Sequence, residues 1–304
     1  MTKRLCRQIG FGKPLLFWGF SLAFGLSRRT SMCSALSSHI LSLLYNQYYF
    51  IFAILPILLF FCGSVMEDDP IIFVLRYGSY KHYFTSKWRS LGVLCSGLWL
   101  GQITILFVTG AGLSVIKQGW DNFSGSSLLK EIAPLLVKSF PGAWVAVFCA
   151  AVYMLMGYWL IALLTLWLGH FLQRQKAIKL LLALYILTIL SIKLPIMSSP
   201  PFCYLTGINH WVLLLHNLTA GWRFPLTATV TLLFVVTVIC SIRGDWRSAA
   251  HHHRISKGLP AYYRHILFSA SNFLVLAISL ALLVGWVWCS GGVPIDGREW
   301  VIRL

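Results

Sequence analysis

Acidic residues are scarce in this sequence, which has 8 Asp and Glu residues against 25 Lys and Arg residues in 304 positions. Charged residues make up 11% of the chain, less than half of the roughly 25% found in ordinary soluble domains. None of the acids stands inside a long apolar run. Since transporters driven by a proton or sodium gradient place carboxylates inside the membrane, the composition argues against that class.

Signatures of catalysis are also missing. The sequence has no GxxxxGK[ST] loop, GxGxxG, HExxH or GxSxG motif, so it predicts no nucleotide site, no cofactor and no enzymatic activity in this chain. The eight cysteines are scattered singly and form no CxxC pair, which favours packing roles over a metal site. Three adjacent histidines, His251 to His253, would point in different directions on a helix. They are interpreted as part of a basic loop, with metal binding as the minor alternative.

Apolar residues, by contrast, are abundant. They make up 58% of the chain, and the mean hydropathy is +0.76, which predicts an integral membrane protein whose backbone groups are satisfied inside helices. Because a span needs about 20 apolar residues, the chain is expected to form a single polytopic all-α transmembrane domain over residues 1–304, with about six or seven spans. The predicted spans cover residues 14–27, 48–66, 91–115, 143–171, 180–198, 224–242 and 266–288.

The positive charge predicts orientation. Most of the 25 Lys and Arg residues fall in segments on one side of these spans, including two basic loops at residues 67–90 and 243–265. The positive-inside rule then predicts a multi-pass protein of the plasma membrane with a cytoplasmic N-terminus. The net charge of +17 is interpreted as contact with anionic lipid headgroups, and no nucleic-acid partner is expected.

The first of these loops combines signals of a helix start with an amphipathic pattern. Glu67, Asp68 and Asp69 precede Pro70, the order typical of a capped helix N-terminus. A helix from Pro70 would bury its apolar residues and expose its basic ones, along a membrane face or on a soluble partner. An ordinary basic cytoplasmic loop explains the residue types equally well.

Small and polar residues suggest how the spans pack. Gly97 and Gly101 are four residues apart and predict a face where two helices approach closely. Gln102 is interpreted as an interhelical hydrogen-bond partner rather than a ligand contact. The half-apolar stretch from Ser198 to Arg223 is too short at its centre to span, so it lies flat or dips into the membrane. Sequons at Asn122 and Asn217 face outward in this topology.

Three features follow one another in this part of the chain: a predicted span, three acids and the stretch VLRYGSYKHYFTSKWRSL. In this order they resemble the membrane subunits of bacterial ABC exporters, in particular small permeases that work with separate ATPase subunits. The resemblance covers residues 48–110 and rests on these positions: Arg76, Tyr77, Gly78, Ser79, Lys81, Tyr83, Lys87 and Trp88. It implies that residues 70–89 form a coupling helix that binds the ATPase. It also implies six spans with both chain ends in the cytoplasm, from which the predicted seventh span departs.

The resulting hypothesis is a permease subunit of an ATP-driven exporter of hydrophobic or amphipathic substrates. The resemblance implies that ATP and Mg²⁺ belong to a partner ATPase, and that two permease subunits form a homodimer or heterodimer with substrate passing between them. The residues expected to contact the ATPase are Asp69, Arg76, Tyr77, Lys81, Tyr83, Lys87 and Trp88. One alternative is a non-transporting accessory or immunity protein of the membrane. A less favoured one is a membrane-embedded lipid-modifying enzyme.

Overall fold

The computed structural model describes residues 1–29, 35–66, 76–115, 134–172, 174–193, 207–218 and 223–242, and the regular elements in these ranges are all helices. The predicted all-α class is therefore confirmed. Several expectations fall outside these ranges. They concern Asp69 and the helix start at Pro70, the sequon at Asn122, the basic loop at 243–265 with His251 to His253, and the apolar stretch at 266–288.

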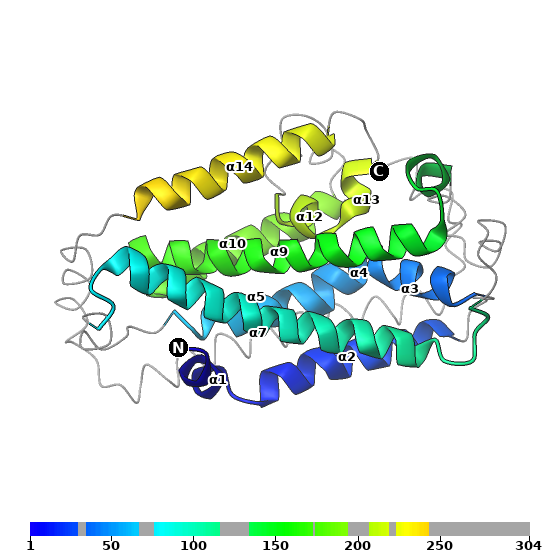
Figure 1. Cartoon of the computed structure of the whole chain (residues 1–304), viewed down its shortest axis with the longest axis horizontal. Helices are drawn as coiled ribbons and strands as arrows, with labels where there is room; N and C mark the ends of the chain where they lie inside the picture. Colours follow the sequence, from blue (N-terminus) through cyan, green and yellow to red (C-terminus); the bar gives the residue numbers. More distant parts are fainter. Residues whose placement is uncertain are drawn as a thin grey trace.

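Two long helices form the centre of the molecule, α7 (Tyr80–Thr109) and α9 (Ala143–Phe171). Helix α2 (Gly12–Arg29) packs along α7, and the short α1 (Thr2–Ile9) precedes it. The bent segment made of α3 (Leu36–Leu44), α4 (Gln47–Tyr49), the π-helix η1 (Phe50–Ile54) and α5 (Leu55–Gly63) packs against α9. The long helices of this bundle lie side by side along its longest axis (Figure 1).

The remaining described helices cover the other side of α9. They are α10 (Arg174–Lys193), the short α12 (Gly207–Val212) and α13 (Leu214–Leu218), and α14 (Arg223–Ser241). Gly157 of α9 is the close contact with α12, because a Cβ at that position would lie 2.5 Å from the Trp211 carbonyl oxygen. Trp211 and Val212 are buried there. The described part of this stretch, residues 207–218, is thus packed against α9, an arrangement that the sequence did not predict.

Helix α7 begins later than the sequence predicted. Residues 76–79 form a turn in which Gly78 has a φ of 71°, a left-handed conformation that suits glycine. Ser79 then caps α7 by accepting a hydrogen bond from the His82 amide at 3.2 Å. A continuous helix from Pro70 to residue 89 is therefore wrong, because residues 80–89 are the first turns of the 30-residue α7.

The second predicted span also differs from expectation. The chain bends by 50° between α3 and the helical run Gln47–Gly63, and the Asn46 side chain caps the new helix at the Tyr49 amide. Pro56 lies in the first turn of α5, directly after the π-helix. The wider turn of a π-helix changes the hydrogen-bond register just where proline lacks an amide donor.

Helix α3, which precedes that helical run and carries three serines, is largely buried. Ser38 is 2% exposed and donates to the Ala35 carbonyl, while Ser42 donates to the His39 carbonyl. Such bonds to the preceding turn satisfy the hydroxyl without another helix. The hydroxyls of Ser38 and Ser42 are thus hydrogen-bonded within this segment itself.

Specific contacts define two ends of the bundle. At the first, called here the α1 end, Lys13 lies over the Phe60 ring at 4.7 Å and the rings of Tyr80 and His170 are 4.6 Å apart. At the other, the His39 end, His39 Nε2 lies 3.2 Å from Thr109 Oγ1. The Phe107 and Trp144 rings also stack there at 6.2 Å. The helices α2, α3–α5, α7 and α9 therefore run alternately between the two ends.

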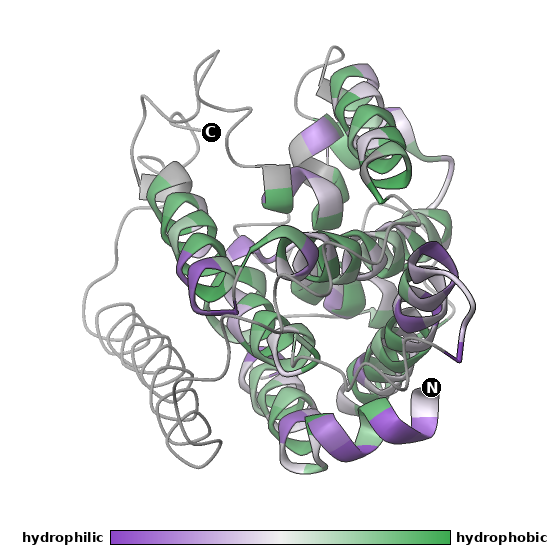
Figure 2. Cartoon of the chain, turned by 90° about the vertical axis from the view of Figure 1, so that its left-hand side faces the viewer, coloured by the Kyte–Doolittle hydropathy of each residue, from purple (hydrophilic) through white to green (hydrophobic). Residues whose placement is uncertain are grey.

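Two helices in the described part, α7 and α9, are each long and apolar enough to cross a membrane. The number rises to four if the bent pairs α1–α2 and α3–α5 each count as one span. The broad prediction of a membrane protein is supported by these helices. Figure 2 views the molecule from the α1 end and shows hydrophilic stretches on α1 beside the mainly hydrophobic ribbons of the long helices.

Candidate functional site

A directional chain of side-chain hydrogen bonds crosses the middle of the bundle. Tyr158 of α9 donates to Gln102 Oε1 at 2.7 Å, and Gln102 Nε2 donates to the Tyr49 hydroxyl at 3.2 Å. Tyr49 donates to Ser21 Oγ at 2.7 Å, and Ser21 donates to the Phe17 carbonyl at 2.9 Å. This buried polar chain joins α9, α7, α4 and α2, so the expectation that Gln102 bonds between helices is confirmed.

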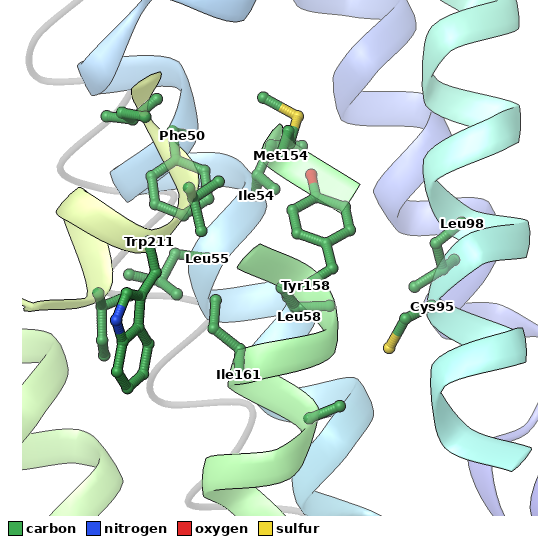
Figure 3. Packing of buried hydrophobic residues seen from close by; sticks show 14 of the residues in the cluster. Phe50, Ile54, Leu55, Leu58, Cys95, Leu98, Met154, Tyr158, Ile161 and Trp211 are labelled. Atoms are coloured by element: carbon green, nitrogen blue, oxygen red, sulfur yellow. The ribbon is translucent and has the colours of Figure 1, made fainter. Parts of the chain in front are cut away.

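The chain is sealed from solvent by aromatic and aliphatic side chains. Gln102, Ser21 and Tyr158 are 0% exposed, and Tyr49 is 1% exposed. The Phe24 ring stacks on Tyr49 at 4.4 Å, and Phe17 meets Tyr158 edge to face at 6.2 Å. In Figure 3 the Tyr158 ring lies between Ile54 of the π-helix and Leu98 of α7. Polar groups this deep must be paired, because an unpaired one costs about 1–3 kcal/mol.

The elbow, defined as residues 76–82 at the start of α7, lies at the surface of the α1 end. Arg76, Lys81 and His82 are exposed at the α1 end. Tyr77 is half-buried and packs on the Tyr83 ring, with the two centroids 5.6 Å apart. The exposed elbow therefore presents cations and one aromatic ring at its surface, a combination suited to an acidic partner or to anionic lipid.

Three of the predicted contact residues face the bundle instead. Tyr83 is 3% exposed, and Lys87, at 8%, lies with its Nζ 5.7 Å from the Tyr83 ring centroid. Trp88 is half-buried and donates to the Trp159 carbonyl at 3.4 Å. The physical reason is helical geometry. Tyr83 and Lys87 are four positions apart and share the buried face of α7, and the neighbouring Trp88 packs on Trp159 of α9.

The predicted glycine pair serves as a helix contact at only one of its two positions. A Cβ on Gly101 would overlap the indole of Trp18, whose Nε1 donates to the Leu98 carbonyl at 3.2 Å. A Cβ on Gly97 would meet no atom of the structure within 4 Å. The contact that sequence reasoning missed is Gly92, where a Cβ would lie 2.8 Å from the Trp159 ring. Glycine and a large indole from a neighbouring helix thus replace the expected small-xxx-small face.

A second polar cluster joins α9 to α12, α13 and α14. Asn217 Nδ2 donates to the Tyr153 hydroxyl at 2.6 Å and to the His210 carbonyl at 2.9 Å. Thr227 donates to Asn217 Oδ1 at 2.9 Å. Asn217 is 1% exposed, so its amide is enclosed by the protein; the side of the membrane on which this sequon lies stays a prediction. The hydrogen bonds of Asn217 connect the short helices α12 and α13 to α9 and α14.

The His39 end holds a buried histidine. Thr109 donates to the Leu106 carbonyl at 3.0 Å, so His39 Nε2 is the donor to Thr109 Oγ1. A Cβ on Gly25 would lie 2.7 Å from that Thr109 hydroxyl. Arg29 also donates to the Ala111 carbonyl at 2.5 Å. These contacts fix the far end of α7 to α2 and α3.

Helix α7 therefore links three places in the molecule. It starts at the exposed elbow, carries Gln102 into the buried polar chain, and ends at the His39 contact. It is one uninterrupted α-helix of 30 residues, which at about 1.5 Å per residue is about 45 Å long. A force applied at the elbow would be transmitted along the helix axis to the centre.

Within the described ranges, no group of three or more His, Cys, Asp or Glu residues is close enough to hold a metal ion. All eight acidic residues of the sequence fall outside those ranges. The chemistry that the described site offers is therefore hydrogen bonding, packing and positive charge. No protein-family model, curated protein or solved structure matches this chain.

Proposed function

We propose that this chain is the permease subunit of an ATP-driven exporter, moved by a separate ATPase that binds at the elbow. The observation that carries the proposal is the uninterrupted α7, which joins an exposed basic surface to the hydrogen-bonded centre of the bundle. A subunit without its own nucleotide motif needs such a lever, because conformational change requires a partner that binds its two states with different affinity.

The proposed topology has six or seven spans in the plasma membrane. Helix α14 runs parallel to α9, since Asn217 links Tyr153 to Thr227 and Trp167 packs on Phe234 at 5.8 Å. Counting α10 and α14 as spans gives six alternating crossings in the described part, and residues 266–288 would be a seventh. The α1 end carries most of the described cations and is assigned to the cytoplasm. Those cations are Lys3, Arg4, Arg7, Lys13, Arg76, Lys81, Lys87, Arg89, Arg174, Lys176 and Lys179.

The proposed contact with the ATPase is narrower than the resemblance implies. Arg76, Tyr77 and Lys81 remain candidates because they are accessible. Tyr83, Lys87 and Trp88 would transmit movement to α9 through their packing. The filled centre of the bundle, with Tyr158 fully buried, supports a substrate path between two permease subunits rather than through one. Hydrophobic or amphipathic molecules suit a path bounded by apolar helix faces.

The experiment that tests this proposal starts with the full chain, purified in mild detergent from its own host. We expect an ATPase with a nucleotide-binding motif to copurify. In reconstituted vesicles the double variant R76E/K81E should reduce stimulated ATP hydrolysis by about 5- to 30-fold, the effect of losing about 1–2 kcal/mol of coupling. The matched control, Lys138→Glu, reverses a cation that precedes α9 near the His39 end and should leave hydrolysis unchanged.

A second candidate function is a non-transporting accessory or immunity protein, and the closed hydrogen-bonded centre is the observation that favours it. A chain recovered without any ATPase would support this candidate and overturn the permease proposal. Equal ATP hydrolysis in the elbow variant and the wild type would overturn the assignment of the elbow as the coupling surface.

A further inference from the structure

Helix α1 has two chemically different faces. Leu5 and Ile9 are 0% and 4% exposed and point into the bundle, where α1 packs on α7. Lys3, Cys6 and Arg7 are exposed. The apolar stripe fixes α1 to the bundle, and the basic stripe is left at the surface, where cations beside a membrane attract anionic lipid headgroups.

The orientation of α1 agrees with that location. It meets α2 at an angle of 71°, so a roughly upright α2 leaves α1 nearly parallel to the membrane plane. Phe11 stands at the joint between the two helices and is 73% exposed. Segments that lie at a membrane surface place apolar side chains such as Phe at the boundary between headgroups and acyl chains. Figure 1 shows α1 at one end of the bundle, turned across the direction of α2.

The charge on the outer face lacks a described counterpart. Lys3 and Arg7 are four residues apart, so they occupy neighbouring turns of the same face, where like charges repel. None of the acidic residues of the chain lies within the described ranges. An anion placed between the two side chains would relieve this repulsion, and the layer of anions at this depth of a membrane is the phosphate of anionic lipids.

We propose that the exposed face of α1, made of Lys3, Cys6, Arg7 and Phe11, is a binding surface for anionic phospholipid headgroups. Lys3 and Arg7 contact the phosphate, while Phe11 enters the acyl-chain boundary. The surface is independent of ATP coupling, since it lies on α1 and not on the elbow. Two observations favour an anionic lipid as the ligand of this surface. They are the positive charge of Lys3 and Arg7 and the angle between α1 and α2, which places α1 along the membrane plane.

Native mass spectrometry of the full chain in mixed micelles tests this proposal, with phosphatidylglycerol and phosphatidylcholine as the probes. We expect the double variant K3Q/R7Q to bind phosphatidylglycerol about 5- to 30-fold less tightly, as about 1 kcal/mol per cation implies, and phosphatidylcholine equally well. The matched control, K176Q/K179Q, removes two exposed cations from α10 at the same end. It should retain phosphatidylglycerol binding.

Equal losses in the two double variants would overturn the proposal, because they would indicate general attraction to a basic end. Competition by free glycerol phosphate at the same concentration would equally contradict a lipid surface. A second measurement uses the wild-type chain and does not depend on how the variants fold. In vesicles, phosphatidylglycerol should slow alkylation of Cys6 by a charged maleimide, as read by site-resolved mass spectrometry. If alkylation of Cys6 is slow only when a copurified protein is present, and not when phosphatidylglycerol is present, the face binds a protein partner and the lipid proposal is refuted.

Discussion

The elbow, where α7 begins, and the centre of α7 differ in the chemistry of their side chains. The elbow carries the cations Arg76 and Lys81 at the surface of the molecule. The centre carries Gln102, fully buried and bonded to Tyr49 and Tyr158. The side chains at the elbow are therefore accessible, whereas the side chains at the centre hold four helices together.

The difference teaches how far residue type alone can locate a site. Lys87 and Trp88 share the composition of the elbow but belong to the packed part of the helix by position. The boundary falls within about one turn of Lys81, where α7 first meets α9. A surface role proposed for this loop therefore applies only to residues before that boundary. Variants on the two sides of the boundary, or on the two faces of α7, are expected to differ.

The largest effect is expected at the glycine positions. Gly101→Ala places a methyl group in the Trp18 indole and should lower the free energy of unfolding by about 1–3 kcal/mol. Gly97→Ala adds the same methyl group in open space and should leave stability unchanged or raise it by up to about 1 kcal/mol. Thermal unfolding of the two variants in the same detergent measures the difference. Equal destabilisation would contradict the packing of α2 on α7.

Removing the amide at the centre comes next. Gln102→Leu deprives the Tyr158 hydroxyl of its acceptor and should cost about 1–2 kcal/mol, since interhelical bonds in membrane proteins average about 0.6 kcal/mol and reach about 1.7. Thr104→Val on the exposed face is the control, because Thr104 bonds only within its own helix, to the Leu100 carbonyl. Adding Tyr49→Phe to Gln102→Leu should cost little more. Full additivity of the two losses would show that the polar chain is not one unit.

The smallest expected change in the free energy of unfolding comes from substituting Lys87 and Lys81. Lys87→Met keeps the apolar stem but removes the charge above the Tyr83 ring, and it should cost about 0.5–2 kcal/mol. Lys81→Met is exposed and should stay within about 0.5 kcal/mol of the wild type. Unfolding in denaturing detergent compares the two variants. A larger loss at Lys81 than at Lys87 would reverse the boundary drawn between elbow and bundle.

Much of the architecture could be read from apolar run lengths, because a helix that crosses lipid must satisfy its backbone with its own residues. Runs over α7 and α9 located both helices, and the isolated amide of Gln102 pointed to a bond between spans. None of the predicted spans covers α3, whose Ser38 and Ser42 satisfy their hydroxyls by bonds to nearby carbonyls of the same segment. The lengths of apolar runs in a sequence do not reveal such local hydrogen bonds.

The site was harder to predict than the fold. The face that a residue takes on α7 depends on where α9 packs, and that contact is set by Gly92 and Trp159, which are far apart in the sequence. The Asn217 cluster likewise needs α9, α12, α13 and α14 to meet. Charge patterns located the elbow, whereas partners distant in the chain decided which of its side chains stay accessible.

The central claim is that the elbow lies at the cytoplasmic end of a membrane-spanning α7. Single cysteines introduced at Lys81 and at Lys138 test it with a membrane-impermeant maleimide, in a background without other reactive thiols. The account predicts that the Lys138 position reacts in intact cells, while the Lys81 position reacts only after permeabilisation. Labelling of the Lys81 position in intact cells would contradict it.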